Sequence, residues 1–226
     1  ALAGWYLKRF LRWRTPGRLG TFHHICAINN YVFLPIIILQ NNYSERHVAL
    51  LLLMNVGSTV GFWTIGVMTF TGGGSVGQAL RSIFSINDAA VVAALLVCFL
   101  GIPVPEPFAY TLKYLGDITV PLMLVVIGVA LVSCFKRLFD HWFDMFYLSL
   151  VRLVAIPVVL LLLLRLLPLE PDAFETAAVV AAMPAASSSV LVARQYGGDY
   201  EFAGQAIIIT TVLSLATIPL LLRFFL

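Results

Sequence analysis

Two long apolar stretches of the chain are each interrupted near the middle by a proline and polar residues. The first interruption runs over 29–35, and the second runs over 184–189. A break in a membrane helix frees backbone N–H and C=O groups, and in hydrocarbon these persist only where protein, water or substrate satisfies them. Paired breaks in two halves of a membrane protein are typical of a transporter's substrate site. The residues that we expect to bind substrate are Asn29, Asn30, Tyr31, Pro35, Pro184, Ser187 and Ser188.

The side chains in these two interruptions suit a small anion. An asparagine amide can donate a hydrogen bond to a carboxylate, and a serine hydroxyl can solvate a substrate oxygen. The half-helix after each break presents free N–H groups at the positive end of its dipole. Two alternatives stay open. The asparagines can instead bridge helices without a ligand, and the serines can serve only close packing or bonds back to their own helix.

Two ionisable residues lie inside apolar segments. Asp117 is about ten residues into segment 108–135, and intramembrane carboxylates are costly and usually functional. We therefore expect Asp117 to couple transport to a proton or another ion, unless it lies near the outer water or pairs with Lys113. Arg152, inside segment 142–167, can neutralise an anion, reach the interface, or bond a carbonyl or carboxylate.

Composition places the chain in a membrane. Of its 226 residues, 61% are hydrophobic and 11% are charged, with a mean hydropathy of +0.96, whereas soluble domains are about 45–50% apolar and about 25% charged. Cys26, Cys98 and Cys134 lie far apart without metal-ligand spacing, so we expect buried thiols rather than a disulfide. The acidic residues are single and scattered. We expect no metal, no cofactor, no catalytic residue and no enzymatic activity.

Seven complete membrane spans are predicted, since one span needs about 20 apolar residues. We place them at 19–40, 46–70, 88–101, 108–135, 142–167, 171–195 and 200–225. Basic residues favour the cytoplasmic side, and the first loop carries five of them: Lys8, Arg9, Arg12, Arg14 and Arg18. Beside an apolar span such a run is a topology anchor, so we expect no nucleic-acid partner.

The two interrupted segments form an internal repeat. A shift of 156 residues places Glu45 on Glu201 and Ser58 on Ser214, and the break, the polar hinge and the following span coincide. The two copies begin on opposite sides of the membrane, which indicates an inverted repeat.

The repeat defines the expected organisation of the chain. We expect the end of a truncated helix and a basic cytoplasmic loop at 1–18, and the last two helices of a first repeat at 19–74. A second five-helix repeat is expected at 75–226, with the broken helices at 19–40 and 171–195. The chain is then N-terminally truncated, without its first two helices and most of the third.

Three blocks of sequence resemble the auxin efflux carrier family. The C-terminal block comprises 182–193, 195–199 and 209–219, and the other two blocks are 115–131 and 152–157. Their order and spacing are specific, and the resemblance runs from about residue 20 to the end. The family includes plant auxin carriers and bacterial carriers of malate- or malonate-like acids. The resemblance implies ten helices in two inverted five-helix units.

The first interruption departs from the family pattern. Family members usually read Gly-Asn-Thr-Gly followed by Leu-Pro, and here Asn30 and Pro35 match whereas the glycines are absent. Tyr31 and Val32 make the break bulkier. We therefore expect a narrower pocket than the family pattern gives.

The expected molecule is an all-α, multi-pass protein of the cell membrane. We expect it to carry a small organic anion, such as a mono- or dicarboxylate, outward by alternating access, driven by an ion gradient or by membrane potential. Protons and sodium are the candidate coupling ions, and a homodimer is the candidate assembly. The alternatives are a sodium-coupled carrier of the bile-acid-transporter type and a seven-helix receptor or sensor. No Gly-rich phosphate loop supports drive by ATP.

Overall fold

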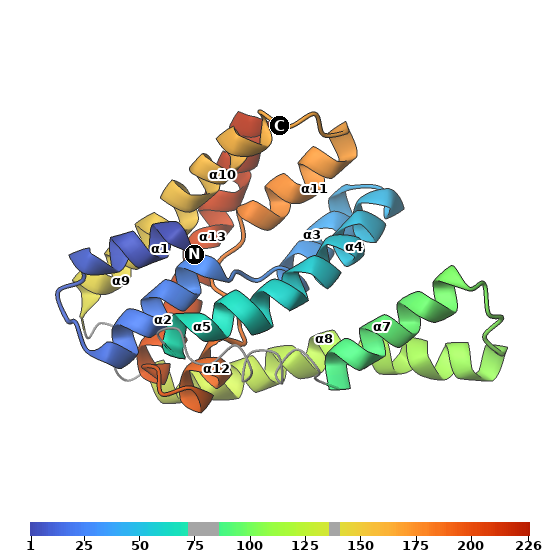
Figure 1. The fold of residues 1–226 in the computed structure, drawn as a ribbon, viewed down its shortest axis with the longest axis horizontal. Coiled ribbons are helices and arrows are strands. Elements are labelled where there is room, and N and C mark those ends of the chain that lie inside the picture. The colour runs from blue at the N-terminus through green and yellow to red at the C-terminus, as the bar shows by residue number, and fades with distance from the viewer. Residues whose placement is uncertain (72–85, 136–140) are drawn as a thin grey trace.

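The computed structural model describes residues 1–71, 86–135 and 141–226, and every regular element in this part of the chain is a helix (Figure 1). The first range contains α1 (Leu2–Leu7), the 3-10 helix η1 (Lys8–Phe10), α2 (Pro16–Ala27), α3 (Phe33–Asn42), α4 (Glu45–Gly61), the π-helix η2 (Phe62–Gly66) and α5 (Val67–Thr71). The others contain α7 (Ile86–Phe99), α8 (Glu106–Phe135), α9 (Trp142–Leu150), the π-helix η3 (Val151–Ala155), α10 (Ile156–Leu164), α11 (Pro171–Ala181), α12 (Ser189–Gln195) and α13 (Tyr200–Phe225).

Local sequence explains where several helices begin. Pro16 and Pro171 stand at the first positions of α2 and α11, where the missing N–H costs nothing. The Thr15 hydroxyl caps α2, and the Asp199 carboxylate accepts from the N–H of Phe202 at 2.9 Å to cap α13. Such side-chain caps satisfy N–H groups that the helix itself leaves unpaired.

Both predicted interruptions contain a non-helical stretch, although residues 33–35 already belong to α3 and Ser189 to α12. The chain leaves α2 after Ala27 and re-enters a helix at Phe33, and it leaves α11 after Ala181 and re-enters at Ser189. Segments 19–40 and 171–195 are therefore each a pair of half-helices, as the prolines and polar residues predicted. We call residues 28–32 and 182–188 together the crossing, because these two connections meet.

The other predicted spans are helical over most of their described residues, although 100–101 and 165–167 lie beyond the ends of α7 and α10, and two spans contain a π-helix that the sequence did not predict. Segment 46–70 corresponds to α4, η2 and α5, and segment 142–167 to α9, η3 and α10. Among the described residues, two helices are long and apolar enough to cross a membrane, namely Trp142–Leu164 and Tyr200–Phe225. The half-helices fail this test individually because α2, with 12 residues, spans only about 18 Å.

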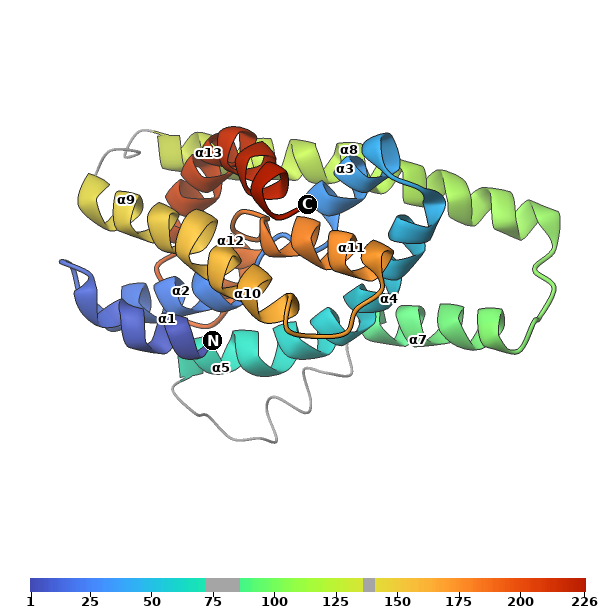
Figure 2. The same cartoon turned by 90° about the horizontal axis from the view of Figure 1, so that it is seen from above.

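The crossing lies between two apolar clusters that hold the helices together. One cluster joins α2, α9 and α13 through side chains such as Phe22, Leu148 and Phe202. The other joins α3, α4, α11 and α13 and includes Leu39 and Val179. Figures 1 and 2 show α7 and part of α8 extending away from these helices, and α7 and α8 lie apart when seen from above, while α8 contacts α13. Residues of the crossing belong to both clusters, Ala185 to the first and Ala182 and Met183 to the second, so packed helices hold the crossing in place.

Two clusters of ion pairs join helix ends that lie on opposite sides of the crossing; Figure 1 shows where these helices lie. Where α2 and α13 begin, Arg18 donates to the Asp199 carboxylate at 3.0 Å and lies 3.8 Å from Asp144. Where α4 and α11 begin, Arg46 lies 3.2 Å from Asp172 and also pairs with Glu170. Each half-helix that enters the crossing, α2 or α11, is therefore tied at its far end to the helix that comes after the other broken pair, α13 or α4.

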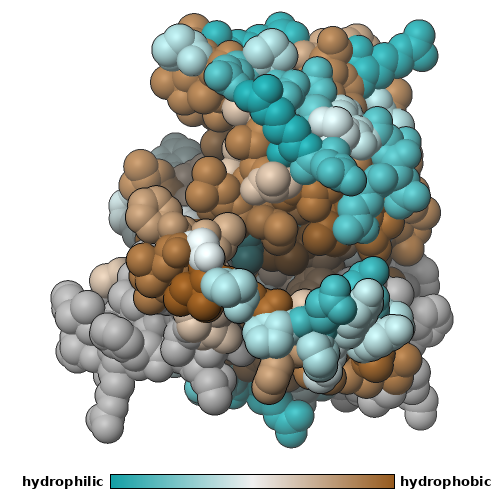
Figure 3. All heavy atoms as spheres, turned by 90° about the vertical axis from the view of Figure 1, so that its right-hand side faces the viewer, coloured by the Kyte–Doolittle hydropathy of each residue, from teal (hydrophilic) through white to brown (hydrophobic). Residues whose placement is uncertain are grey.

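The outer surface of the helices is largely apolar. Figure 3 shows hydrophobic side chains over the middle of one face, with hydrophilic side chains gathered mainly toward the top. Large hydrophobic side chains are exposed along α10 and α13, among them Leu162, Leu163, Leu215 and Phe224. Apolar exposure of this extent is a liability in water and is what lipid contact requires.

Candidate functional site

The two interruptions contact each other through the backbone. Asn29 and Ala185 form an isolated antiparallel bridge, and the N–H of Asn30 donates to the carbonyl of Pro184 at 2.9 Å. A proline carbonyl is available here because the break removes the helical N–H that would otherwise take it. The crossing is therefore a two-stranded contact built from residues far apart in sequence.

Side chains satisfy further backbone groups that the breaks free. The Asn29 amide donates to the carbonyl of Val180 at 2.5 Å, close to the end of α11. In the second interruption, the N–H of Ala185 donates to the hydroxyl of Thr210 on α13 at 3.2 Å. Since unsatisfied backbone groups in hydrocarbon cost several kcal/mol, these contacts explain how the crossing stays unwound.

Arg152 joins the ends of both half-helices. It lies on η3 and is 2% exposed. Its Nε and Nη2 donate to the carbonyl of Met183 at 3.2 and 3.0 Å, and its Nη1 donates to the carbonyl of Cys26 at 3.4 Å. Cys26 is in the last turn of α2, and Met183 follows the end of α11. A guanidinium, with five donors in a fixed fork, can serve both carbonyls at once.

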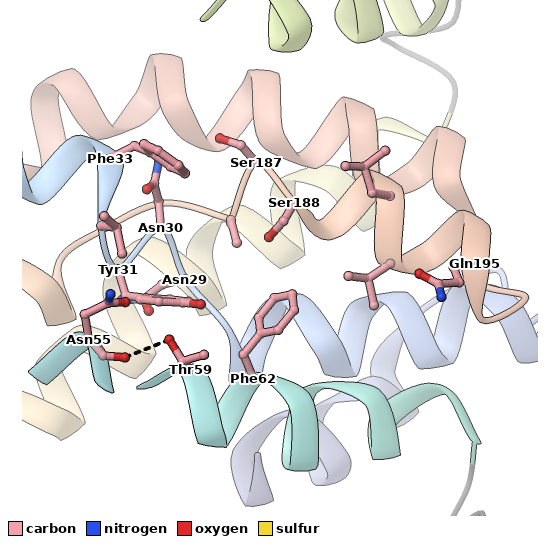
Figure 4. A pocket seen from close by; sticks show the side chains of 14 residues that line it. Asn29, Asn30, Tyr31, Phe33, Asn55, Thr59, Phe62, Ser187, Ser188 and Gln195 are labelled. Atoms are coloured by element: carbon pink, nitrogen blue, oxygen red, sulfur yellow. Dashed lines mark hydrogen bonds between the residues drawn. The ribbon is translucent and has the colours of Figure 1, made fainter. Parts of the chain in front are cut away.

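A cavity of about 490 Å³ opens beside the crossing. Figure 4 shows side chains from both interruptions converging on it, together with side chains from α4, η2 and α12. Its polar lining residues are Asn29, Asn30, Tyr31, Asn55, Thr59, Ser187, Ser188 and Gln195. Its apolar lining residues are Val32, Phe33, Phe62, Ala186, Leu191 and Val192.

The cavity lining is polar but uncharged. None of the fourteen described residues that line it is acidic or basic. Amide and hydroxyl groups can donate to carboxylate oxygens, while Phe62 and Tyr31, whose ring centroids are 6.3 Å apart, offer apolar surface. A few polar groups in a mainly apolar concavity is the usual make-up of a small-molecule site.

Five of the seven predicted substrate-binding residues line the cavity. Asn29, Asn30 and Tyr31 come from the first interruption, and Ser187 and Ser188 come from the second. The two prolines lie elsewhere.

Pro35 and Pro184 are buried and do not line the cavity. Pro184 acts through its carbonyl, and Pro35 lies in the first turn of α3. They shape the break without facing the space beside it.

Asp117 stands apart from this group. The structure places it on α8, where it is exposed, and it is not among the described residues that line the cavity. A proton-coupling role for Asp117 stays a prediction. Any such role would act from α8, through the contact of that helix with α13.

Nine lining residues were not among the predicted site residues, and they include Asn55, Thr59, Phe62 and Gln195. Asn55 and Thr59 are four residues apart in segment 46–70, and residues at this spacing share a helix face, which is a partial sequence signal for both. Neither Phe62 nor Gln195 has a local signal, since both reach the cavity through the packing of η2 and α12.

Comparisons with known proteins show the family of this chain. The family model described as "Membrane transport protein" matches residues 1–222. A protein of Rhizobium meliloti (strain 1021) described as "Putative malonate transporter" is 31% identical over 150 residues, which is 66% of this chain. The match covers 46% of that relative, so this chain spans about half of its length.

The matched residues include both interruptions, Arg152 and α13, the elements that build the crossing. The resemblance to the auxin efflux carriers that the sequence blocks indicated is therefore confirmed. This chain, whose broken helices meet at a polar cavity, therefore belongs to the membrane transport protein family, that of the auxin efflux carriers.

Proposed function

We propose that this chain forms the crossing of a secondary carrier for a small organic anion. The observation that carries the proposal is the uncharged polar cavity at the contact between two broken helices. Its volume of about 490 Å³ falls within the range of about 300–1,000 Å³ that is usual for small-molecule pockets. The family membership supports transport over the receptor and enzyme alternatives.

The chemistry of the cavity favours a mono- or dicarboxylate. Amide and hydroxyl donors from Asn30, Ser187 and Ser188 can replace the water around a carboxylate. Arg152 does not line the cavity, but its guanidinium contacts the crossing beside it, at the carbonyl of Met183. A positive charge near the cavity favours an anion. The relative described as "Putative malonate transporter" makes malonate the first substrate to test.

Alternating access is the proposed mechanism. The helices on either side of the crossing would rock about the bound anion, which would open it first to one face of the membrane and then to the other. The polar clusters around Arg18 and Arg46 tie opposite ends of the crossing helices. These ion pairs are therefore the contacts that this motion would stretch or break. We further propose outward transport across the cell membrane, an inverted repeat and a homodimer.

The test is uptake into proteoliposomes that contain the complete protein. Labelled malonate, malate and indole acetate would be supplied with and without a pH gradient. Asn30→Ala removes a lining amide, whereas Asn42→Ala is a matched control, because Asn42 is exposed and its amide bonds its own helix at 2.9 Å. We expect saturable uptake that Asn30→Ala abolishes and Asn42→Ala preserves. Equal uptake by both variants would place the substrate elsewhere.

The same vesicles test the proposed coupling residue. We expect the pH gradient to stimulate uptake by the unaltered protein, and Asp117→Asn to remove that stimulation because an amide cannot carry the proton. Stimulation that survives in Asp117→Asn would exclude Asp117 from proton coupling while leaving the substrate site unaffected.

A further inference from the structure

The carbonyl groups at the ends of the two incoming half-helices already have a cation. In transporters with broken helices, unwound carbonyls and half-helix C-terminal ends are the groups that coordinate a coupling sodium ion. Here the corresponding carbonyls of Cys26 and Met183 accept hydrogen bonds from the Arg152 guanidinium. A second cation at these oxygens would have to displace or adjoin a positive charge.

Arg152 is held by these carbonyls rather than by an acid. It is 2% exposed, and among the ion pairs of the described residues none joins it to a carboxylate. The C-terminal end of a helix carries a partial negative charge, so two half-helix ends that meet at one guanidinium offset its charge. The guanidinium is therefore held by carbonyl oxygens, which are the kind of ligand that a hard metal cation also takes.

The local backbone explains how the guanidinium reaches both carbonyls. Arg152 lies on the π-helix η3 in the middle of a span that is otherwise α-helical on both sides. A π-helical turn widens the helix by one residue, and such turns occur often at functional sites. Since Cys26 lies in the last turn of α2 and Met183 directly follows α11, Arg152 also fixes where the two half-helices end relative to each other.

We propose that Arg152 is a fixed cation that occupies the place of a coupling sodium ion at the crossing, so that transport by this protein is independent of sodium. The proposal rests on the proposed function, because it concerns how the same crossing is energised. Arg152 acts here as a positioning residue: it holds the Cys26 and Met183 carbonyls, and it does not line the cavity. Removing its side chain should open a site for a soluble cation.

The experiment uses the complete protein in proteoliposomes, with sodium or N-methylglucamine as the external cation. We expect the unaltered protein to take up malonate equally in both. Arg152→Ala should lower uptake about tenfold or more, because one charge-assisted hydrogen bond is worth about that factor. Millimolar guanidinium should restore part of the uptake, and sodium should restore part of it where N-methylglucamine does not.

Two further variants separate this role from a purely structural one. Arg152→Lys keeps a charge at the crossing, so its uptake should be reduced but still equal in the two cations. Arg165→Ala is the matched control, because exposed Arg165 also donates to a helix-end carbonyl, that of Phe225, at 3.0 Å. Its uptake should respond to neither guanidinium nor sodium.

A thermal-unfolding assay keeps the proposal testable even if no acid is transported. Guanidinium should raise the unfolding temperature of purified Arg152→Ala and leave that of the unaltered protein and of Arg165→Ala unchanged. Sodium-dependent uptake by the unaltered protein, or an Arg152→Ala variant that neither cation stabilises or activates, would overturn the proposal. Absence of uptake with cation-specific stabilisation of Arg152→Ala would count against the proposed function alone.

Discussion

The two interruptions occupy equivalent places in their helices, yet they contribute opposite chemistry to the crossing. The first supplies donors: the Asn29 amide and the Asn30 N–H both point to the other break. The second supplies an acceptor, the carbonyl of Pro184, and the last turn of α11 before it supplies another, the carbonyl of Val180. The N–H of Ala185 in the second break takes its acceptor, the Thr210 hydroxyl, from α13. Similar positions in a repeat can therefore carry unequal roles, so the two breaks need not tolerate the same substitutions.

The largest effect is expected when the first break loses its side-chain donor. Asn29→Ala deletes the hydrogen bond to Val180 and also a lining amide. Leaving a buried partner unsatisfied costs about 1–3 kcal/mol, so we expect a lower unfolding temperature and a loss of malonate uptake. Asn29→Gln, which keeps an amide, should restore part of both. Normal uptake by Asn29→Ala would mean that the remaining contacts of the crossing hold it without this hydrogen bond, and that the Asn29 amide does not bind substrate.

A somewhat smaller effect is expected when the second break loses the side chain that accepts from its backbone. Thr210→Val keeps the shape of a buried side chain but removes the oxygen that accepts from the Ala185 N–H. We expect a loss of about 1–2 kcal/mol of stability, measured by thermal unfolding in detergent. Thr211→Val on the exposed face of α13 is the control and should change little. Equal effects in both variants would show that the second break does not depend on α13.

The backbone and the side chain of Asn30 have separate contacts, one with the second break and the other with the cavity. Its N–H makes the contact with Pro184, while its side-chain oxygen lies 3.4 Å from the N–H of Leu34 and its amide lines the cavity. In any variant that retains uptake, such as Asn30→Ser, the apparent KM should rise while the unfolding temperature stays near that of the unaltered protein. A fall in stability without a change in KM would assign Asn30 to the fold rather than to the substrate.

The smallest effect is expected at the hydroxyls of the second break. Ser187→Ala and Ser188→Ala each remove a partly exposed hydroxyl from the cavity lining. Each should change stability by no more than about 0.5 kcal/mol, as surface substitutions usually do, and uptake should fall by only a few fold. The double variant, measured over a range of malonate concentrations, shows whether either serine contributes to binding.

The sequence predicted the breaks because their causes are local. Proline lacks an N–H, and asparagines in an apolar span have few other uses, so the positions of Pro35, Pro184 and Asn30 mark the interruptions directly. The pairing of Asn29 with Ala185 leaves no such mark, because it depends on how two distant segments pack.

The partners of Arg152 were the least predictable part of the site. They are backbone carbonyls, which every residue type possesses, so nothing in the residues at 26 or 183 identifies them as acceptors. The π-helical turn that brings Arg152 to them has no clear sequence signal either.

The contacts of Arg152 also have a consequence for biogenesis. When segment 142–164 enters the bilayer, the Cys26 carbonyl is already synthesised, but Met183 lies 31 residues further along the chain. An arginine at mid-membrane costs about 2.5–3.5 kcal/mol on insertion scales, and here the principal acceptor arrives later. We therefore expect a chain that ends before Met183 to insert this segment incompletely, as a glycosylation reporter placed after residue 168 would show, and longer chains to insert it fully.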